Sequence, residues 1–443
     1  MRNVPEDATT DLEGIIAEQQ ILRDTQIQAI STDIVSRTVQ SEELIKNKPI
    51  NQVKAMIFVE SFLGYGHFNI TYLLAKELQA LGVNVAITSS TFDLCGKSFD
   101  FGQSTLYRLP PLTMNADSKQ STPDGRPFIN YIKGPHNAYR KLISDATKTA
   151  LEDFQPSVIV YELFPFLMQW RTASTEAVNA FYQTTVQPER ISLCRDIIHS
   201  TKPDLVLRQL AQDCSRIMIR GDSQFARLEE SQAEWANIDL PIEYVGNFLS
   251  HEINAYQKNT AVENRLVIFG GGGYRGNKDA EFYIQTAASK PFSTTFNNAS
   301  YTVITNDGVP DKVIDAMKLQ DKGLEILPPM NNDRFRDIMA KSKALVTRGG
   351  YNTTFELIGL GKPFVVVPRA EKEQKQRAEF LKRAQMCGVI DEEKLTPTII
   401  GKTLDEVIAT EPHTIQTTFS FDGAHNMARR LLELGSQYER FKY

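Results

Sequence analysis

The chain has 443 residues, of which 41% are hydrophobic and 23% are charged, and its formal net charge is −5 at pH 7. These values are typical of a globular protein of two or three domains with an ample core. The acidic balance disfavours nucleic acid or anionic lipid as a general partner, and no apolar run reaches the roughly 18 residues that a membrane-spanning helix needs.

Residues 1–52 differ from the rest of the chain. Apolar side chains at a loose helical spacing predict one or two amphipathic helices there. Two interpretations stay open: a helical extension docked on its own domain, or an arm that forms a homodimer. The N-terminus has no signal-peptide character, so we expect a cytoplasmic protein. The four cysteines of the chain are Cys95, Cys194, Cys214 and Cys387. They are far apart in the sequence and lack the spacing of metal ligands, which indicates reduced thiols.

An alternating pattern of strands and helices begins at Ala55. Residues 55–60 form an apolar run, a glycine-rich turn follows at residues 64–68, and a helix is expected over residues 70–81. This strand–loop–helix order opens a Rossmann-like parallel sheet. Further apolar strands are expected at 83–88, 157–161, 190–193 and 216–220. The polar loop over residues 110–135 is long enough to be functional or disordered.

A second unit of the same kind starts at residue 264. The apolar run 264–269 leads directly into a loop with four successive glycines, Gly270 to Gly273. Strands are then expected at 301–304, 324–327, 344–347 and 364–367. The sequence therefore predicts an α/β protein with two Rossmann-like domains, at residues 53–250 and 251–420.

The segment after the predicted strand 344–347 combines features of an anion site and a hydroxyl-binding site. Gly349 and Gly350 let backbone approach a ligand closely. Asn352, Thr353 and Thr354 lie at a helix N-terminus, where a diphosphate is favoured. Glu356 falls one turn into that helix, within reach of a pair of sugar hydroxyls. This combination suits a nucleotide-sugar better than a bare phosphate.

With Gln374 and Arg377, this segment resembles the donor-binding motif of glycosyltransferases related to the peptidoglycan N-acetylglucosaminyltransferase. It is most similar to a bacterial branch of predicted glycosyltransferases, as are the segments 63–67, 109–112, 124–127, 162–166 and 195–197. The resemblance implies the glycosyltransferase-B fold, in which two Rossmann-like domains face a cleft. It also implies that a C-terminal helix in residues 421–443 packs back on the N-terminal domain.

The residues expected to bind the donor come from the two glycine loops and from the C-terminal motif. They are Gly64, Gly66, Gly271, Gly272, Gly273, Tyr274, Arg275, Met330, Arg348, Gly350, Asn352, Thr353, Thr354, Glu356, Gln374 and Arg377. For Arg348 an alternative stays open, in which it pairs with a nearby carboxylate. The family has a small residue where this chain has Tyr351, which leaves the identity of the sugar open.

His67 is the first candidate for the catalytic base, because an imidazole can accept an acceptor proton near neutral pH. Glu162 and Asp93 are rival bases, since each follows a strand. Two other interpretations of His67 stay open: the imidazole donates to a sugar oxygen in the cleft, or His67 is a helix-start residue that only caps backbone. No Asp-x-Asp metal motif stands out, so we expect neither a metal nor a cofactor and assign the stabilisation of the leaving diphosphate to helix dipoles and basic side chains.

The resemblance implies an inverting glycosyltransferase that uses a nucleotide-diphosphate sugar, most simply a UDP-sugar, on an acceptor that the sequence does not identify. Two alternatives remain. A nucleotide-sugar 2-epimerase or hydrolase can use the same fold, and a non-catalytic sugar-nucleotide-binding subunit is the other. Retention of His67, Glu356 and Gln374 together argues against the non-catalytic subunit.

Overall fold

The structure is a computed structural model, and its described residues all belong to one compact unit, Asn51–Tyr443. It describes residues 53–60, 66–91, 99–110, 136–166, 172–183, 186–249, 261–271, 279–305, 309–321, 323–328, 330, 332–410 and 420–441. Several of the predicted features lie outside these residues: the extension 1–52, Gly64, Asp93, the loop 111–135, Gly272, Gly273, Tyr274 and Arg275.

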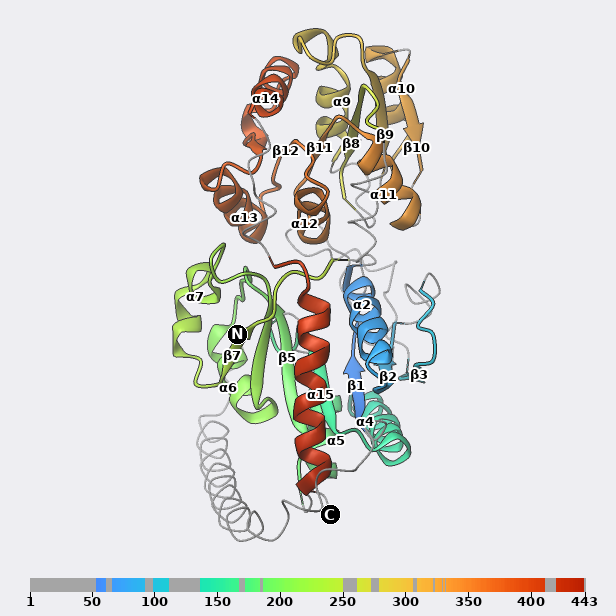
Figure 1. Cartoon of the computed structure of the whole chain (residues 1–443), viewed down its shortest axis with the longest axis vertical. Helices are drawn as coiled ribbons and strands as arrows, with labels where there is room; N and C mark the ends of the chain where they lie inside the picture. The colour runs from blue at the N-terminus through green and yellow to red at the C-terminus, as the bar shows by residue number, and fades with distance from the viewer. Residues whose placement is uncertain are drawn as a thin grey trace. The chain divides into compact units, whose positions relative to one another are not determined.

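The N-terminal half is built on a parallel sheet with the strand order β3-β2-β1-β4-β5-β6-β7 (Figure 1). The strands are β1 (Lys54–Phe58), β2 (Asn84–Ser89), β3 (Thr105–Arg108), β4 (Val158–Glu162), β5 (Glu189–Arg195), β6 (Arg216–Arg220) and β7 (Ile242–Tyr244). The chain runs outward from β1 to one edge and then from β4 to the other. This order places a topological switch point between β1 and β4, where α/β proteins bind ligands.

Alternate residues of the central strands enter two separate hydrophobic clusters, one on each face of the sheet. In β1, Ala55 and Ile57 join the cluster under α2 and α15, whereas Met56 and Phe58 join the cluster on the opposite face. This alternation explains why the strand sequence is apolar without interruption, since both faces are buried. The helices are α2 (Gly66–Ala80), α4 (His136–Phe154), α5 (Thr172–Phe181), α6 (Pro203–Asp213), α7 (Leu228–Ser231), η4 (Ala233–Asn237) and α15 (Gly423–Phe441).

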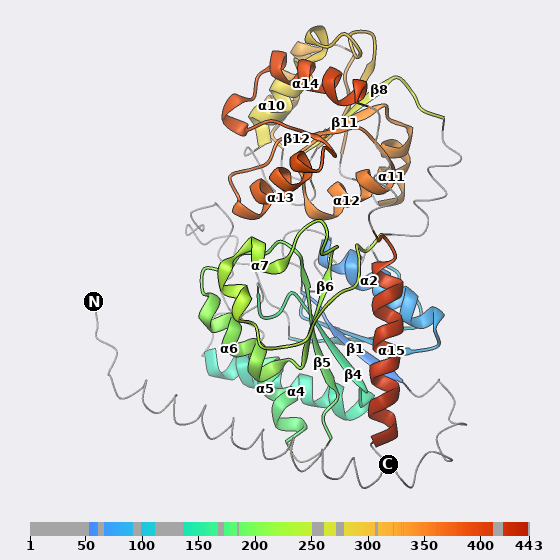
Figure 2. The ribbon, with the colours of Figure 1, turned by 60° about the vertical axis from the view of Figure 1, so that its left-hand side comes forward.

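The C-terminal half repeats this design with the strand order β10-β9-β8-β11-β12-β13, again parallel throughout. The strands are β8 (Arg265–Phe269), β9 (Ser300–Ile304), β10 (Glu325–Leu327), β11 (Ala344–Thr347), β12 (Phe364–Val366) and β13 (Gly388–Val389). The helices are α9 (Ala280–Ala287), η6 (Lys290–Phe292), α10 (Asp311–Gln320), α11 (Asn332–Lys341), α12 (Tyr351–Gly359), α13 (Lys372–Arg383), η7 (Glu392–Lys394) and α14 (Pro397–Ala409). Figure 2 shows α12 and α13 on one side of these strands and α10 and α14 on the other.

The last helix, α15, belongs to the core of the N-terminal half. Met427, Ala428 and Leu431 are fully buried in the cluster that contains β1 and α2. In both views of the ribbon, α15 lies beside α2 (Figures 1 and 2). The described part of the chain therefore starts and finishes in the N-terminal half, and the chain passes twice between the halves.

The predicted fold class is confirmed: the protein is α/β with two parallel sheets. The sequence analysis missed β3, β7 and β13, which lie at the edges of the sheets. All three are short, and none carries the continuous apolar run of a strand that is buried on both faces.

Candidate active site

The polar residues that connect the two halves follow the carboxyl ends of strands. In the N-terminal half, His67 lies in the first turn of α2, Glu162 ends β4, and Arg220 ends β6. In the C-terminal half, Tyr351 and Asn352 begin α12 directly after β11. The carboxyl ends of parallel strands are where ligand sites of α/β proteins gather. The described residues therefore bring the two expected ligand edges into contact.

His67 and Glu162 form a pair. The ring Nδ1 of His67 lies 2.8 Å from Oε2 and 3.0 Å from Oε1 of Glu162. The Glu162 side chain is fully buried, whereas 24% of the His67 side chain is exposed. Because an ionised carboxylate only accepts hydrogen bonds, we assign the proton to Nδ1, which leaves Nε2 as the acceptor of the neutral ring. Glu162, predicted as a rival base, is thus placed as the partner that orients His67.

Asn352 connects the start of α12 with the N-terminal half. Its Nδ2 donates to the carbonyl of Gly66 over 3.4 Å, and its Oδ1 accepts from Nη1 of Arg220 over 3.3 Å. A Cβ atom at position 66 would come within 3.2 Å of Nδ2 of Asn352. The absence of a side chain on Gly66 therefore lets α12 approach the start of α2.

The start of α12 has the geometry of an anion site. Gly349 has a φ of 70°, and a Cβ there would lie 2.6 Å from Val366, so the turn requires glycine. Gly350 is the N-cap, and a Cβ atom added to it would meet no other atom within 4 Å. The first-turn amides, including that of Thr353, have no acceptor within the helix. Thr354 is fully buried, and its hydroxyl has no hydrogen-bond partner among the described residues. These donors suit a phosphate.

Glu356, the predicted ribose ligand, accepts hydrogen bonds from Arg336. Its Oε1 lies 3.2 Å from Nε and 3.0 Å from Nη2 of the guanidinium. Only 8% of Glu356 is exposed, and burial raises the pKa of its carboxyl although Arg336 opposes this shift. In this structure one carboxylate oxygen is therefore already occupied by a charged partner. The ribose role stays a prediction.

Arg348 is placed in a carboxylate pair, which is the alternative that the sequence left open. It is 1% exposed, and its Nε donates to Oδ1 of Asp279 over 2.9 Å, while Nη2 contacts Glu392. The donor contact predicted for Arg348 would require the guanidinium to leave this buried pair. Arg369 binds the same Asp279 and donates to the carbonyl of Gly270 over 2.6 Å, so this carboxylate also anchors the start of the second glycine loop.

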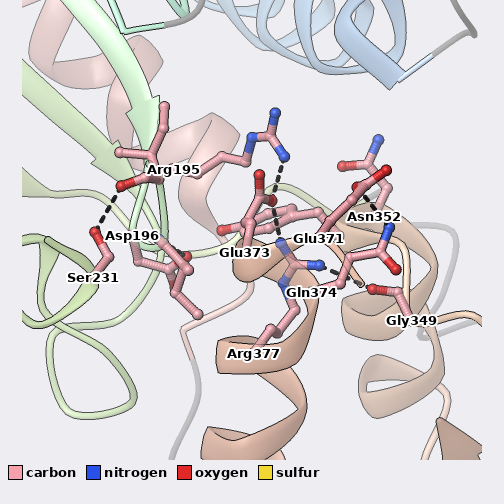
Figure 3. Close-up of polar contacts among 12 residues, drawn as sticks. Arg195, Asp196, Ser231, Gly349, Asn352, Glu371, Glu373, Gln374 and Arg377 are labelled. Atoms are coloured by element: carbon pink, nitrogen blue, oxygen red, sulfur yellow. Dashed lines mark hydrogen bonds and ion pairs between the residues drawn. The ribbon is translucent and has the colours of Figure 1, made fainter. Parts of the chain in front are cut away.

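Gln374 and Arg377 lie on α13, and Arg377 contacts the turn before α12 (Figure 3). Gln374 accepts from the amide of Arg369 over 3.1 Å and donates to Glu371. Arg377 is 1% exposed and donates to the carbonyl of Gly349 over 2.9 Å. Arg377 is therefore a buried support for the turn. Its predicted contact with the donor stays untested, as does that of Gln374.

Glu373, which the sequence analysis did not single out, links the two halves. Its Oε1 accepts from Nη1 of Arg195 over 2.5 Å, and it also pairs with Arg377 (Figure 3). Burial alone would raise the pKa of this carboxyl, but the two guanidiniums outweigh burial and lower it. In the sequence, Arg195 belongs to the segment 195–197, which resembles the family. That resemblance assigns no function to Arg195 or to its pairing with Glu373.

Tyr351 fills the space where the family has a small residue. Its hydroxyl donates to the carbonyl of Arg220. The centre of its ring lies 4.8 Å from the guanidinium carbon of Arg220, 4.9 Å from that of Arg377 and 5.7 Å from that of Arg195. Burial raises its pKa well above the ordinary value. Tyr351 is therefore a neutral residue that packs between guanidiniums of both halves.

Met330 makes a packing contact in the C-terminal half. It is half-buried and packs against the hydrophobic cluster that contains α11 and α12. The predicted contact with a base ring stays a prediction.

Three further properties of the described residues bear on function. None of their helices is long and apolar enough to cross a membrane. They hold no group of three or more histidine, cysteine, aspartate or glutamate side chains arranged to bind a metal ion. Cys194, Cys214 and Cys387 are free thiols in the described part of the chain.

Comparison with known proteins finds matches mainly to the C-terminal half. The glycosyltransferase family 28 C-terminal domain matches residues 276–427. A UDP-N-acetylglucosamine–N-acetylmuramyl-(pentapeptide) pyrophosphoryl-undecaprenol N-acetylglucosamine transferase of Clostridium novyi (strain NT) is 28% identical over 112 residues. The match spans 24% of this chain and 31% of that relative. The transferase of the same name from Legionella pneumophila (strain Lens) is 27% identical over 81 residues, 17% of this chain and 22% of the relative.

Solved structures resemble nearly the whole chain. Acinetobacter baumannii MurG superposes with a TM-score of 0.56 at 12% identity, covering 86% of this chain and 99% of that one. Arabidopsis thaliana UGT89C1, solved with UDP, gives a TM-score of 0.56 at 12% identity and covers 86% of this chain and 100% of its own. At such identity the likeness shows the fold. The chain therefore has the glycosyltransferase-B fold, and residues 276–427 match the glycosyltransferase family 28 C-terminal domain and resemble part of the N-acetylglucosamine transferases named above.

Proposed function

We propose that this protein is a glycosyltransferase that moves a sugar from a nucleotide-diphosphate sugar, most simply a UDP-sugar, to a hydroxyl of an acceptor. The observation that carries the proposal is the pair of His67 and Glu162, which lies beside the start of α12 through Asn352, Gly66 and Arg220. A general base and an anion-binding helix N-terminus are thereby brought together from the two halves. The related family domain and the UDP-bound structural neighbour support a nucleotide-sugar donor.

The chemistry follows from this placement. Nε2 of His67 takes the proton of the acceptor hydroxyl while the oxygen attacks the anomeric carbon, and Glu162 stabilises the imidazolium that forms. The bond from that carbon to the diphosphate oxygen breaks in the same step, so the configuration is inverted. The first-turn amides of α12 stabilise the departing diphosphate, and the mechanism as proposed uses no metal.

The proposal includes a donor site, a cellular location and two open roles for the N-terminal extension. The donor site uses Asn352, Thr353, Thr354, Glu356 and Gln374, with the second glycine loop. The protein acts in the cytoplasm. Residues 1–52 keep both sequence-based interpretations, a helical extension docked on its own domain or the arm of a homodimer.

The first experiment is calorimetry with UDP, TDP, GDP and their sugar conjugates. Saturable binding of one nucleotide class identifies the donor, and release of UDP from UDP-sugar in water then provides an activity readout without a known acceptor. His67→Ala is expected to lower that release by about 100-fold or more with donor affinity retained. Absence of binding by every nucleotide would contradict the proposal. Release in water frees one sugar for each UDP, so the rate decides: release as fast as ordinary enzyme turnover, about 1 s⁻¹ or more, would favour a hydrolase.

A further inference from the structure

Arg220 is a buried guanidinium with weak partners. Its side chain is 3% exposed. Its hydrogen bond to Oδ1 of Asn352 is 3.3 Å long, and its ion pair with Glu162 spans 3.9 Å. Its Nε has no hydrogen-bond partner among the described residues, as is also the case for Arg216 at the start of the same strand. Burial lowers the pKa of this group, although Tyr351, Glu162 and Asp196 oppose the shift.

Other buried arginines of the described chain are paired more closely. Nε of Arg348 lies 2.9 Å from Asp279, and Nη2 of Arg336 lies 3.0 Å from Glu356. Short contacts of this kind are usual because a guanidinium removed from water needs charged acceptors. Arg220 has looser neighbours: the carboxylate of Glu162 lies 3.9 Å away, and the Tyr351 ring lies 4.8 Å from the guanidinium carbon. An anion bound at a shorter distance would complete these surroundings.

The position of Arg220 identifies where that anion binds. The residue that it contacts, Asn352, lies in the first turn of α12, where the helix dipole presents its positive end. A guanidinium at the positive end of a helix is electrostatically unfavourable unless an anion lies between them. The buried hydroxyl of Thr354, which also lacks a partner among the described residues, belongs to the same helix start.

We propose that Arg220 is a ligand of the donor diphosphate, contributed by the N-terminal half to a site whose other donors come from α12. The inference rests on the proposed function, because it takes the anion to be the diphosphate of a nucleotide-sugar. A guanidinium donates two parallel hydrogen bonds to a phosphate and neutralises charge on the leaving group. The diphosphate thus contacts both halves, and its departure removes one of several contacts between them.

The test compares UDP with uridine, since only UDP carries the diphosphate. Calorimetry on the full chain is expected to show that Arg220→Gln lowers the affinity for UDP by about 10- to 100-fold and leaves that for uridine unchanged. Inorganic pyrophosphate should compete with UDP on the wild type and more weakly on the variant. Arg216→Gln is the matched control, because Arg216 starts the same strand and pairs with Glu243. It should retain the wild-type preference for UDP.

The outcomes separate the inference from the proposed function. An unchanged ratio of UDP to uridine affinity in a folded Arg220→Gln variant overturns the role of Arg220 alone. Failure of the wild type to bind any nucleoside diphosphate overturns both. If Arg220→Gln does not fold, Arg220→Lys is the second variant. It keeps the positive charge but loses the planar guanidinium that donates two parallel hydrogen bonds. It should lose a smaller part of the preference for UDP, and an unchanged preference in that variant also overturns the role.

Discussion

At the scale of single residues, the pairing of His67 with Glu162 decides what each can do. The two residues are 95 positions apart, and the carboxylate fixes the proton of the imidazole on Nδ1. Glu162→Gln would place an amide there, whose N–H₂ group can donate to Nδ1 and move the proton to Nε2. We therefore expect turnover to fall by about 100-fold or more while donor affinity is retained.

A second histidine–carboxylate pair provides the control for this experiment. Nδ1 of His425 lies 3.1 Å from Oε2 of Glu77, on α15 and α2. Glu77→Gln should leave the release of UDP from the donor unchanged. Equal turnover of the Glu162→Gln variant and the wild type would contradict the assignment of Glu162 as the partner of a catalytic base.

Replacing Glu356 should lower the stability of the fold, which the sequence alone does not predict. From the sequence we expect Glu356→Ala to weaken donor binding while the fold survives. In the structure the change also leaves Arg336, whose side chain is 6% exposed, without its closest carboxylate. Breaking a buried pair in this way costs about 3–5 kcal/mol. The free energy of unfolding in urea should therefore fall in parallel with donor affinity.

Asp333 is the control for that measurement. It lies 3.7 Å from the same guanidinium, but its side chain is 77% exposed. Asp333→Ala should change the free energy of unfolding by less than about 1 kcal/mol, as is usual for exposed pairs. Equal losses in the two variants would show that Glu356 contributes no more than a surface carboxylate.

The raised pKa of Asp196 leads us to expect that the free energy of unfolding depends on pH. It is fully buried, and burial raises its pKa from 3.8 to about 6, although Arg377 opposes the shift. The folded state therefore binds this proton more tightly than the unfolded chain, so the free energy of unfolding falls as pH rises from about 4 to about 6. At about 1.4 kcal/mol for each pKa unit, the loss is on the order of 3 kcal/mol.

Asp196→Asn removes the titrating group and should remove this part of the pH dependence. The measurement is urea unfolding of the variant and the wild type between pH 4 and pH 7, and the difference between the two curves isolates Asp196. Parallel curves across that range would mean that the carboxyl has the same pKa in both states.

At the scale of elements, sequence patterns identified the strands and helix starts whose structure depends on neighbouring residues in the chain. The strand of residues 264–269 was predictable because it is apolar on both faces and is followed by glycines. The edge strand β3 was not, because three of its four residues are exposed. The start of α12 was predictable from its glycines and hydroxyl residues. The partner of Glu356 was not, because Arg336 lies on another helix and no local pattern connects the two.

Gly423, the first residue of α15, shows how closely the two connections between the halves approach each other. A Cβ atom there would lie 2.2 Å from the carbonyl oxygen of Gly246. Backbone cannot move away as a flexible side chain can, so Gly423→Ala should destabilise the protein by roughly 1–3 kcal/mol or more. Thermal unfolding of the purified variant measures this loss.

Gly350→Ala is the matched control for Gly423→Ala. Gly350 has a φ of −59°, and a Cβ there meets no atom within 4 Å. The control should lose only a few tenths of a kcal/mol to about 1 kcal/mol through the poorer N-cap. Similar losses at both positions would show that the chain relaxes freely around Gly423.

At the scale of the whole molecule, the contact between the halves depends on residues that no sequence pattern brings together. Arg195 and Glu373 are 178 positions apart, and neither was assigned a role from the sequence. The two Rossmann-like halves were predictable because each strand and turn is determined locally. The contact between them was not, because it arises from long side chains whose partners are set only by the assembled sheets.

A double-mutant cycle on Arg195 and Glu373 tests whether this contact stabilises the molecule. The two side chains are 15% and 20% exposed, so little water replaces a lost partner. Glu373→Gln should cost more than Arg195→Met, because it removes the carboxylate from both Arg195 and Arg377. The double variant should cost less than the sum of the single changes, with a coupling energy of about 1–3 kcal/mol in urea unfolding. Additive losses would instead mean that the ion pair forms without stabilising the contact, and that other contacts, such as the packing of Phe225 against Phe355 and Phe380, hold the halves together.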